Sequence, residues 1–510
     1  ESETIIRKMY LVNDIVYFQK EEDGIYKIDN GVENLITNDK IVQTNEIVNM
    51  FWHQEQMLIQ TKEQGFYFLT DSSLVPWRIS ASKKLNTVNV YNSIQLADKS
   101  FALGTISNGL IHLTRTGEIN YEINQIKGLS NNTVLNLFED VDNNIWLGLD
   151  NGINCVNIQS PFKIYNDEID GLGTIYTSKV FNNDLYLGTN QGLFVKPLNS
   201  DDEFEFVNGT KGQVWCLVDI DNTLFCGHNS GTFIVSNKTA NLISSVEGTW
   251  DIKQVQKSND LLLQGNYNGL NILKKEGNTW SFRNHIDGFD ISSKNFELSN
   301  SGQIFVNHEY KGIYKITIDK AFYKAEQIVK DSIISLGKHS NLIQYNDEIL
   351  YSYKGGVFKY DYNKDIFKKD SVYSKLYENQ EFTSGKLIAD SKNRLWGFSN
   401  KSINYLSPGK LSNSPTITRI SLPKSLRKEM TGYENISHIT DNYYLIGTST
   451  GYILVDTERM EKAVDREYHV SINSISINAV NDSVIKIDKS LESSFKYLAN
   501  NIAFPFSVTD

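Results

Sequence analysis

The sequence predicts an all-β protein, made mostly of β-propeller repeats and ending in the start of a β-sandwich. Three observations predict this class. Short apolar runs recur with a period of roughly forty residues, polar turns and glycines separate them, and no helical periodicity lies between them. Three or four strands per repeat of this length is typical of a propeller blade, whereas a solenoid has shorter or helical repeats.

A glycine marks the same place in successive repeats, where one predicted strand ends and the next begins. Glycine adopts the left-handed backbone angles of tight hairpins without steric cost. Successive gaps run from 38 to 49 residues, and Ser402 holds this place between the last two members. The glycines are Gly24, Gly65, Gly109, Gly152, Gly192, Gly231, Gly269, Gly312, Gly356 and Gly451.

The eleven units between residues 8 and 458 exceed the usual four to eight blades of one ring, so we expect two groups. Residues 1–164 are predicted to form four blades of a partial ring, and residues 165–465 a closed seven-bladed ring. The pattern then changes, because residues 470–477 alternate strictly and no glycine hairpin follows. Residues 466–510 are therefore predicted to begin a β-sandwich.

The chain begins with Glu1, has no signal-peptide core and stops inside a predicted strand, so we expect a piece of a longer protein. No run approaches eighteen apolar residues, and none is expected to span a membrane. The formal charge is −11, with no concentration of Lys and Arg, which argues against nucleic-acid binding.

Cysteine usage and short motifs give no sign of a metal, a cofactor or a catalytic centre. Cys155, Cys216 and Cys226 include no C-x-x-C pair, and the last two lie in apolar runs, where we expect small buried side chains. No H-E-x-x-H or G-x-S-x-G motif is present, so we expect no enzyme. A lyase or glycosidase that assembles carboxylates from distant blades stays open as an alternative.

Asp140, Asp142 and Asn144 have the spacing of the first three ligands in a calcium loop. The loop's glycine and its final glutamate are replaced by Ile145 and Asn151. We therefore interpret the residues as a hairpin turn and predict no metal site.

Two pairs of tryptophans differ in predicted role. Trp146 and Trp396 lie in central strands and are expected to pack between blades. Trp215 and Trp250 lie where innermost strands begin, near a channel mouth, so they are candidate ligand-binding residues, with burial as the alternative. His228, in a predicted hairpin loop, is a third candidate, with a solvated side chain as its alternative.

One repeat resembles the two-component-regulator propeller repeat. Residues 128–134 read GLSNNTV, residues 144–148 read NIWLG and residues 150–152 read DNG. Residues 389–397, ADSKNRLWG, are similar. Residues 498–504, LANNIAF, resemble the start of the triple-tyrosine domain that follows such propellers.

The resemblance implies the extracytoplasmic sensor region of a membrane-bound bacterial regulator, as in Bacteroidetes hybrid two-component or LuxR-type proteins. A glycan or oligosaccharide is the implied signal, a homodimer is possible, and the membrane would be reached only through a helix downstream of this segment. The location would be periplasmic. A protein-interaction or dimerisation scaffold without a small ligand is the alternative, and it predicts a broad apolar surface in place of a polar, aromatic-lined pocket.

Overall fold

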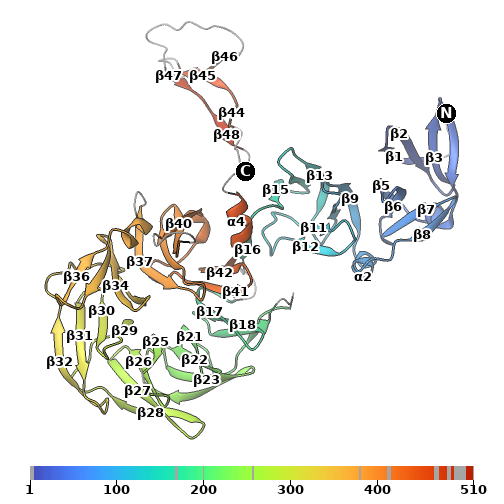
Figure 1. The fold of residues 1–510 in the computed structure, drawn as a ribbon. Coiled ribbons are helices and arrows are strands. Elements are labelled where there is room, and N and C mark those ends of the chain that lie inside the picture. The colour runs from blue at the N-terminus through green and yellow to red at the C-terminus, as the bar shows by residue number, and fades with distance from the viewer. Residues whose placement is uncertain are drawn as a thin grey trace. The chain divides into compact units, whose positions relative to one another are not determined.

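The computed structural model describes residues 5–166, 171–198, 200, 202–255, 258–377, 381–409, 415–463, 470–478, 484–487 and 501–508. It is nearly all β, as the sequence predicts, and consists mainly of four-stranded antiparallel sheets (Figure 1). The chain divides into two compact units, Pro161–Met460 and Glu1–Ser160 with Glu461–Asp510.

The unit Pro161–Met460 is a ring of seven four-stranded sheets, coloured green to orange in Figure 1. Six sheets use four consecutive strands each. They are β17(Ile175–Phe181) to β20(Glu205–Phe206) with β18(Asp184–Thr189) and β19(Leu193–Pro197); β21(Val214–Ile220), β22(Thr223–His228), β23(Gly231–Ser236) and β24(Thr239–Ser244); β25(Asp251–Gln254), β26(Leu261–Asn266), β27(Gly269–Glu276) and β28(Thr279–His285); β29(Asn295–Leu298), β30(Ile304–His308), β31(Gly312–Ile318) and β32(Ala325–Lys330); β33(Asn341–Tyr345), β34(Glu348–Tyr353), β35(Gly356–Asp361) and β36(Ile366–Lys369); β37(Phe382–Ala389), β38(Leu395–Ser399), β39(Ser402–Ser407) and β40(Thr416–Ser421).

The seventh sheet closes the ring, because it joins the two ends of this unit. Strand β16(Phe162–Asn166) supplies its outer edge and pairs antiparallel with β43(Gly451–Asp456), next to β42(Tyr443–Thr448) and β41(Ile436–Thr440). The innermost strands of the first and last blades also touch, and the Ser178 hydroxyl donates to Ser437 Oγ over 2.8 Å. Strand β16 begins three residues before the expected start of the ring at residue 165.

Neighbouring blades are held together by apolar side chains and by Asp390. Trp396 is 0% exposed and lies in a cluster with Tyr405, Tyr444 and Ile453. Its indole N–H and the Tyr444 hydroxyl both donate to Asp390 Oδ2 over 2.8 Å, which links two successive sheets. The predicted packing of Trp396 between blades is confirmed.

In the other unit, residues 1–160 contain four described sheets in chain order, and the first strands of these sheets contact one another successively. The strands are β1(Ile6–Val12), β2(Ile15–Lys20), β3(Gly24–Asp29) and β4(Val32–Thr37); β5(Ile47–His53), β6(Gln56–Thr61), β7(Phe66–Thr70) and β8(Ser73–Pro76); β9(Val90–Gln95), β10(Phe101–Thr105), β11(Leu110–Leu113) and β12(Ile119–Ile123); β13(Val134–Glu139), β14(Asn144–Leu149) and β15(Ile153–Asn157).

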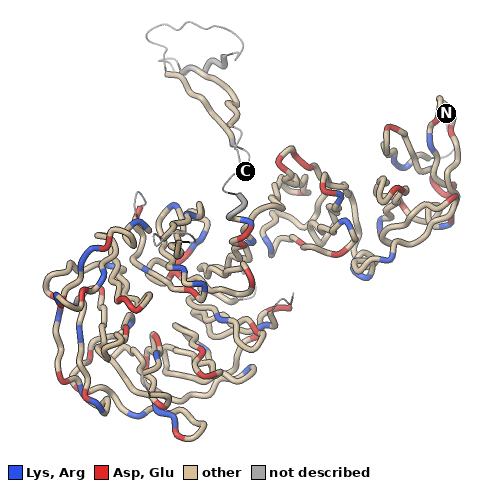
Figure 2. Tube along the Cα trace, in the orientation of Figure 1, with Lys and Arg blue, Asp and Glu red and all other residues tan. Residues whose placement is uncertain are grey.

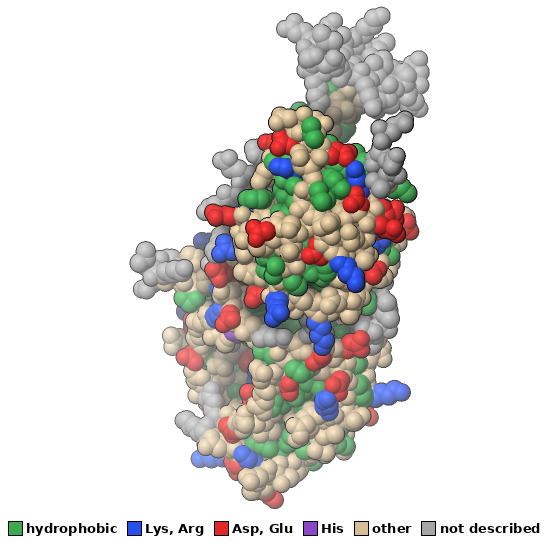
Figure 3. All heavy atoms as spheres, turned by 90° about the vertical axis from the view of Figure 1, so that its right-hand side faces the viewer, with side chains coloured by type: hydrophobic (Ala, Val, Ile, Leu, Met, Phe, Trp, Pro, Cys, Tyr) green, Lys and Arg blue, Asp and Glu red, His purple; other side chains and the backbone are tan. Residues whose placement is uncertain are grey.

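The first and fourth sheets of this unit expose apolar side chains, since no further sheet of the described residues pairs with them in a ring. Met9 and Leu11 of β1 are exposed, as are Phe138 of β13 and Ile153 of β15. Figure 3 shows apolar side chains interspersed with charged ones on the face of the molecule that is turned to the viewer.

Asp140 forms the hairpin turn that the sequence predicts. Its Oδ1 accepts from the backbone N–H groups of Asp142 and Asn144, both over 2.9 Å. Its Oδ2 accepts from the Trp146 indole over 2.8 Å. Trp146 is 42% exposed, so the expected burial between two blades is wrong at this position, because the fourth sheet is the last of its group and no further sheet of the described residues follows it there.

The remaining elements are short. The helices are α1(Lys40–Thr44), α2(Ser82–Leu85), α3(Lys424–Arg427) and α4(Thr457–Ala463), with a 3-10 turn η1(Tyr373–Tyr377). None of the helices described is long and apolar enough to cross a membrane. The C-terminal strands β44(Val470–Ile472) to β48(Phe506–Val508), with β45(Ile475–Asn478), β46(Val484–Ile487) and β47(Asn501–Ala503), form two small sheets.

The alternating stretch 470–477 is two strands, not one, since β44 pairs with β48 while β45 pairs with β46 and β47. Residues 498–500, part of the triple-tyrosine resemblance, lie outside the described residues. The start of a sandwich domain stays a prediction.

Candidate functional site: the channel mouth of the seven-bladed ring

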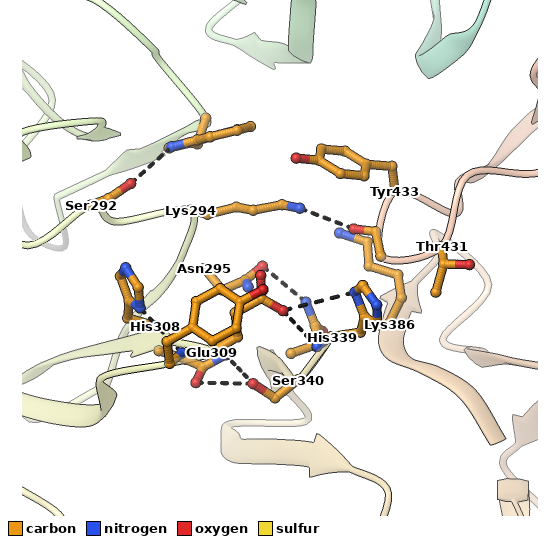
Figure 4. Close-up of a pocket in the computed structure, with 15 residues that line it drawn as sticks. Ser292, Lys294, Asn295, His308, Glu309, His339, Ser340, Lys386, Thr431 and Tyr433 are labelled. Carbon is orange, nitrogen blue, oxygen red and sulfur yellow. Dashed lines mark hydrogen bonds and ion pairs between the residues drawn. The ribbon is translucent and has the colours of Figure 1, made fainter. Parts of the chain in front are cut away.

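The innermost strands of all seven blades surround a central channel. A cavity of about 620 Å³ is lined by residues of β17, β21, β25, β29, β33, β37 and β41. A second cavity of about 320 Å³ lies where several of these strands begin and shares part of that lining. We call the second cavity the mouth pocket; its lining includes Trp250, Lys294, Glu309, His339, Lys386 and Tyr433 (Figure 4).

Four half-buried aromatic rings gather at this end of the channel from three blades and one loop. The Trp215 ring centroid lies 4.6 Å from that of Trp250 and 5.0 Å from that of Tyr176. Tyr433 lies 5.5 Å from Tyr176 and 5.8 Å from Trp215. Tryptophan and tyrosine offer flat apolar faces with polar edges, which is the surface on which a sugar ring can stack.

Lys294 enters the aromatic group from the residue before β29. Its Nζ lies 3.4 Å from the Tyr433 ring centroid and 5.5 Å from that of Trp250, and it donates to the Gly432 carbonyl over 3.1 Å. Burial lowers the pKa of Lys294 to about 7, and the charge of Lys386 adds to the shift. The side chain therefore carries a partly desolvated amine at neutral pH.

The channel below the mouth pocket holds a paired lysine. Lys253 Nζ lies 2.9 Å from Glu297 Oε2 and 3.2 Å from Asp251 Oδ2. Burial works to lower the pKa of Lys253, but the Glu297 and Asp251 carboxylates outweigh it and raise the pKa. Burial raises the pKa of Glu297, and Lys253 offsets this in part.

Amide side chains fix the wall of the mouth pocket by bridging blades. Asn341 Nδ2 donates to Asn295 Oδ1 over 3.0 Å, and the Leu387 N–H donates to Asn341 Oδ1 over 3.2 Å. Asn307 Nδ2 donates to Ser340 Oγ over 3.0 Å. Because these bonds cross three successive blades, the polar groups that face the cavity are held in place before any ligand arrives.

A segment between β40 and β41, residues 422–435, carries Tyr433 to the mouth pocket. Arg427 and Glu429 anchor it as a fully buried ion pair, with Arg427 Nη2 2.6 Å from Glu429 Oε1. The same nitrogen donates to the Ser399 carbonyl over 2.6 Å. Gly432 has φ +82°, and its N–H donates to Glu434 Oε2 over 2.8 Å, so the turn before Tyr433 is fixed on both sides.

Two of the three candidate residues from the sequence line the channel, and the third does not. Trp215 lies in β21 and Trp250 immediately before β25, with their rings in contact. His228 ends strand β22, is 1% exposed and accepts or donates through Nδ1 to Ser230 Oγ over 2.8 Å. It is neither in a loop nor solvated, because β22 extends one residue beyond the expected strand.

The sequence did not single out Lys294, Lys386 or Tyr433. Their position in the repeat could have indicated two of them, since Lys294 and Tyr433 come shortly before innermost strands, as Trp250 does. Lys386 lies within β37. Aligning the repeats by their innermost strands would have brought these residues together, whereas searching for motifs could not.

Among the residues that the structure describes, no group of three or more His, Cys, Asp or Glu side chains is arranged so that it could hold a metal ion. The three cysteines are unpaired, and Cys226 is buried in a blade core as expected. Cys216 is half-buried and borders the channel.

Comparisons with known proteins support the propeller class. The family described as "Two component regulator propeller" matches residues 128–151. The fold is similar to that of the extracellular domain of BT3049 from B. thetaiotaomicron, described as a hybrid two component system, with a TM-score of 0.64 and 13% identity. That match covers 93% of this chain and 65% of the other, so this chain spans about two thirds of that solved domain.

Two further solved structures are more distant. The extracellular domain of BT4673 from B. thetaiotaomicron, also described as a hybrid two component system, has a TM-score of 0.46 at 14% identity, covering 95% of this chain and 74% of that one. PorZ, a surface component of the type-IX secretion system of Porphyromonas gingivalis, has a TM-score of 0.37 at 12% identity, covering 95% and 76%. No curated protein matches the sequence.

Proposed function

We propose that this chain is the extracytoplasmic ligand-sensing region of a membrane-bound bacterial regulator, and that the mouth pocket binds an oligosaccharide. One observation carries the proposal: clustered aromatic rings and fixed amides line a cavity at the channel mouth. That combination of flat apolar faces with a few convergent polar groups is what a sugar requires. The family match at residues 128–151 supports the regulatory role.

A thermal-shift screen of the whole chain against an oligosaccharide panel tests the proposal. A ligand that binds only the folded state raises the melting temperature in proportion to its concentration and affinity. We expect a dose-dependent shift with one class of glycan. The substitution Trp250→Ala should weaken binding by at least about tenfold, equivalent to roughly 1.4 kcal/mol.

Trp52→Ala is the matched control, since Trp52 is an exposed tryptophan of β5 in the other unit. It should leave the shift unchanged. A panel that produces no shift with verified folded protein would contradict the sensor proposal.

A second candidate, a protein-interaction or dimerisation scaffold, is favoured by the exposed apolar side chains of the first and fourth sheets. Exposed apolar side chains can mark association sites in soluble proteins where they form a patch. Light scattering over a range of concentrations would test it. A dimer that dissociates when Phe138→Ser and Ile153→Ser are combined would favour the scaffold, and a monomer at all concentrations would exclude self-association.

We propose a non-catalytic role. The carboxylates Asp251 and Glu297 share Lys253, which leaves neither free as the acid or base of a hydrolytic pair. The proposal predicts that a bound oligosaccharide is recovered intact after prolonged incubation. Appearance of shortened or unsaturated products would show an enzyme.

A further inference from the structure

The three lysines that line the channel differ in whether they form ion pairs. Lys253 has two carboxylate partners, whereas Lys294 and Lys386 form no ion pair with any described residue. Lys294 contacts a carbonyl oxygen and aromatic rings. Burial lowers the pKa of Lys386 as well, and the Asp251 and Glu434 carboxylates offset this only in part.

Both amines reach one place. Lys294 crosses the mouth pocket toward Gly432 and Tyr433, and Lys386 reaches the same side of the pocket from β37 (Figure 4). The charge of Lys386 lowers the pKa of Lys294, in addition to the larger effect of burial. Two like charges brought together in a partly desolvated cavity are unfavourable unless an anion joins them.

Glu309 and Glu434 raise the pKa of Lys294 and so offset part of the effect of burial, but neither carboxylate forms an ion pair with Lys294 or Lys386 among the described residues. Glu309 Oε2 accepts from the His339 backbone N–H over 2.6 Å and lies 3.8 Å from His339 Nδ1. Glu434 is 1% exposed and accepts the Gly432 N–H. Lys and Arg alternate with Asp and Glu along the chain in both units (Figure 2). The pocket differs in that two of its lysines form no ion pair with a described residue.

We propose that the ligand of the mouth pocket is an acidic sugar, whose carboxylate or sulfate group binds between the ammonium groups of Lys294 and Lys386. The inference rests on the proposed function and specifies its ligand class. The sugar ring stacks on Trp250 and Tyr433, the two aromatic residues with indole or phenol rings that line the pocket beside Lys294, while the anion replaces the Gly432 carbonyl as the partner of Lys294. Charge-assisted hydrogen bonds of this type are stronger than neutral ones.

The proposal also predicts how binding depends on pH. The charged or titratable groups that face Lys294 are Lys386, Glu309, Glu434, His308, His339 and Tyr433. An anion favours the protonated form of Lys294, so protein and ligand together take up a proton on binding near neutral pH. Affinity should therefore increase as the pH falls from 8 to 6, while the ligand remains ionised.

Calorimetric titration of the whole chain separates the sources of the anion. One pair of probes is an oligogalacturonate and its methyl-esterified, neutral form; the other is a sulfated carrageenan tetrasaccharide and its desulfated form. We expect one acidic member to bind at least tenfold more tightly than its neutral partner. Lys386→Met should remove that difference, and Lys386→Arg should retain most of it.

Lys354→Met is the control, because Lys354 is an exposed lysine in the turn between β34 and β35 of the same ring. It should leave affinity unchanged. Melting temperatures verify that each variant is folded, and the salt and pH dependence of the wild type provides an independent measure that needs no substitution.

The outcomes distinguish this inference from the proposed function. Equal binding of acidic and neutral partners, or an unaffected Lys386→Met variant, would overturn the acidic ligand and leave the sugar sensor standing. Failure of the acidic probes while neutral glycans bind would do the same. Failure of every glycan in the wider panel would overturn both.

Discussion

Asp390 and Asp140 allow the contribution of single side chains to be compared between two matched turns. Both accept two backbone N–H groups and an indole N–H six residues later. Only Asp390 also accepts the Tyr444 hydroxyl, and its tryptophan is fully buried. The shared turn can therefore be separated from the bonds that join blades.

We expect Asp390→Ala to lower the free energy of unfolding by roughly 2–4 kcal/mol, because it leaves buried donors on Trp396 and Tyr444 without an acceptor. Asp140→Ala should cost about 1 kcal/mol, since water can reach the exposed Trp146. Calorimetric melting of both variants measures the difference. Equal losses would mean that the inter-blade bonds add nothing to the turn.

Lys294 is a second single residue whose substitution should change the free energy of unfolding. Its pKa falls from the ordinary 10.5 to about 7 in the folded protein. Between these values the unfolded chain binds more protons, so wild-type stability increases as the pH rises through this window. Lys294→Met should stabilise the ligand-free protein by roughly 1–3 kcal/mol at pH 7, with a smaller gain at pH 10.

Melting temperatures of wild type and Lys294→Met across this pH range test the prediction. A variant that is less stable than the wild type at pH 7 would show that the contacts with Tyr433 and Gly432 outweigh the cost of burial. Sequence patterns made Trp215 and Trp250 candidate residues, and both line the channel, but the patterns did not single out this lysine, because its burial arises from blades far apart in the chain.

The 422–435 segment is the element that the repeat pattern left undefined. It contains no strand, and its path is fixed by helix α3, by the buried Arg427–Glu429 pair and by hydrogen bonds to neighbouring blades. A buried ion pair is strongly destabilising to break, although replacing both partners with apolar groups is often tolerated. We infer that the Arg427–Glu429 pair holds Gly432 and Tyr433 of this segment beside Lys294.

Arg427→Met should lower stability by roughly 3–5 kcal/mol and weaken ligand binding, since Glu429 is left buried without a partner. The double variant Arg427→Met with Glu429→Leu should recover most of the stability. Thermal melting and ligand titration of the single and double variants check this. A double variant no more stable than the single one would contradict the account.

Closure of the ring belongs to the whole molecule. Strand β16 comes from the start of the unit and β43 from its end, and their pairing completes the seventh sheet. We expect residues 161–460 to fold alone with a single cooperative transition. Removing β16, as in residues 171–460, leaves the edge of β43 unpaired and should lower the melting temperature and promote association.

Circular dichroism and light scattering of the two segments provide the test. Identical melting temperatures would show that the pairing of β16 is dispensable. If residues 161–460 fail to fold, the ring depends on the rest of the chain.

Much of this architecture could be predicted from the sequence, because turn glycines and strand periods act locally and repeat eleven times. The exposed Trp146 and the buried His228 could not, since exposure depends on whether a neighbouring sheet covers a face and on where a strand ends. The mouth pocket could not be predicted from the sequence either, because the channel forms only when the seven innermost strands meet.

The most direct test of the central claim is hydrogen exchange of the whole chain with and without the oligosaccharide that binds most tightly. The account predicts slower exchange in peptides that cover residues 248–251, 292–295 and 431–435, which meet at the channel mouth. These segments should lose that protection in Trp250→Ala. Protection confined to residues 5–160, or to the outer strands of the ring, would contradict the assignment of the site.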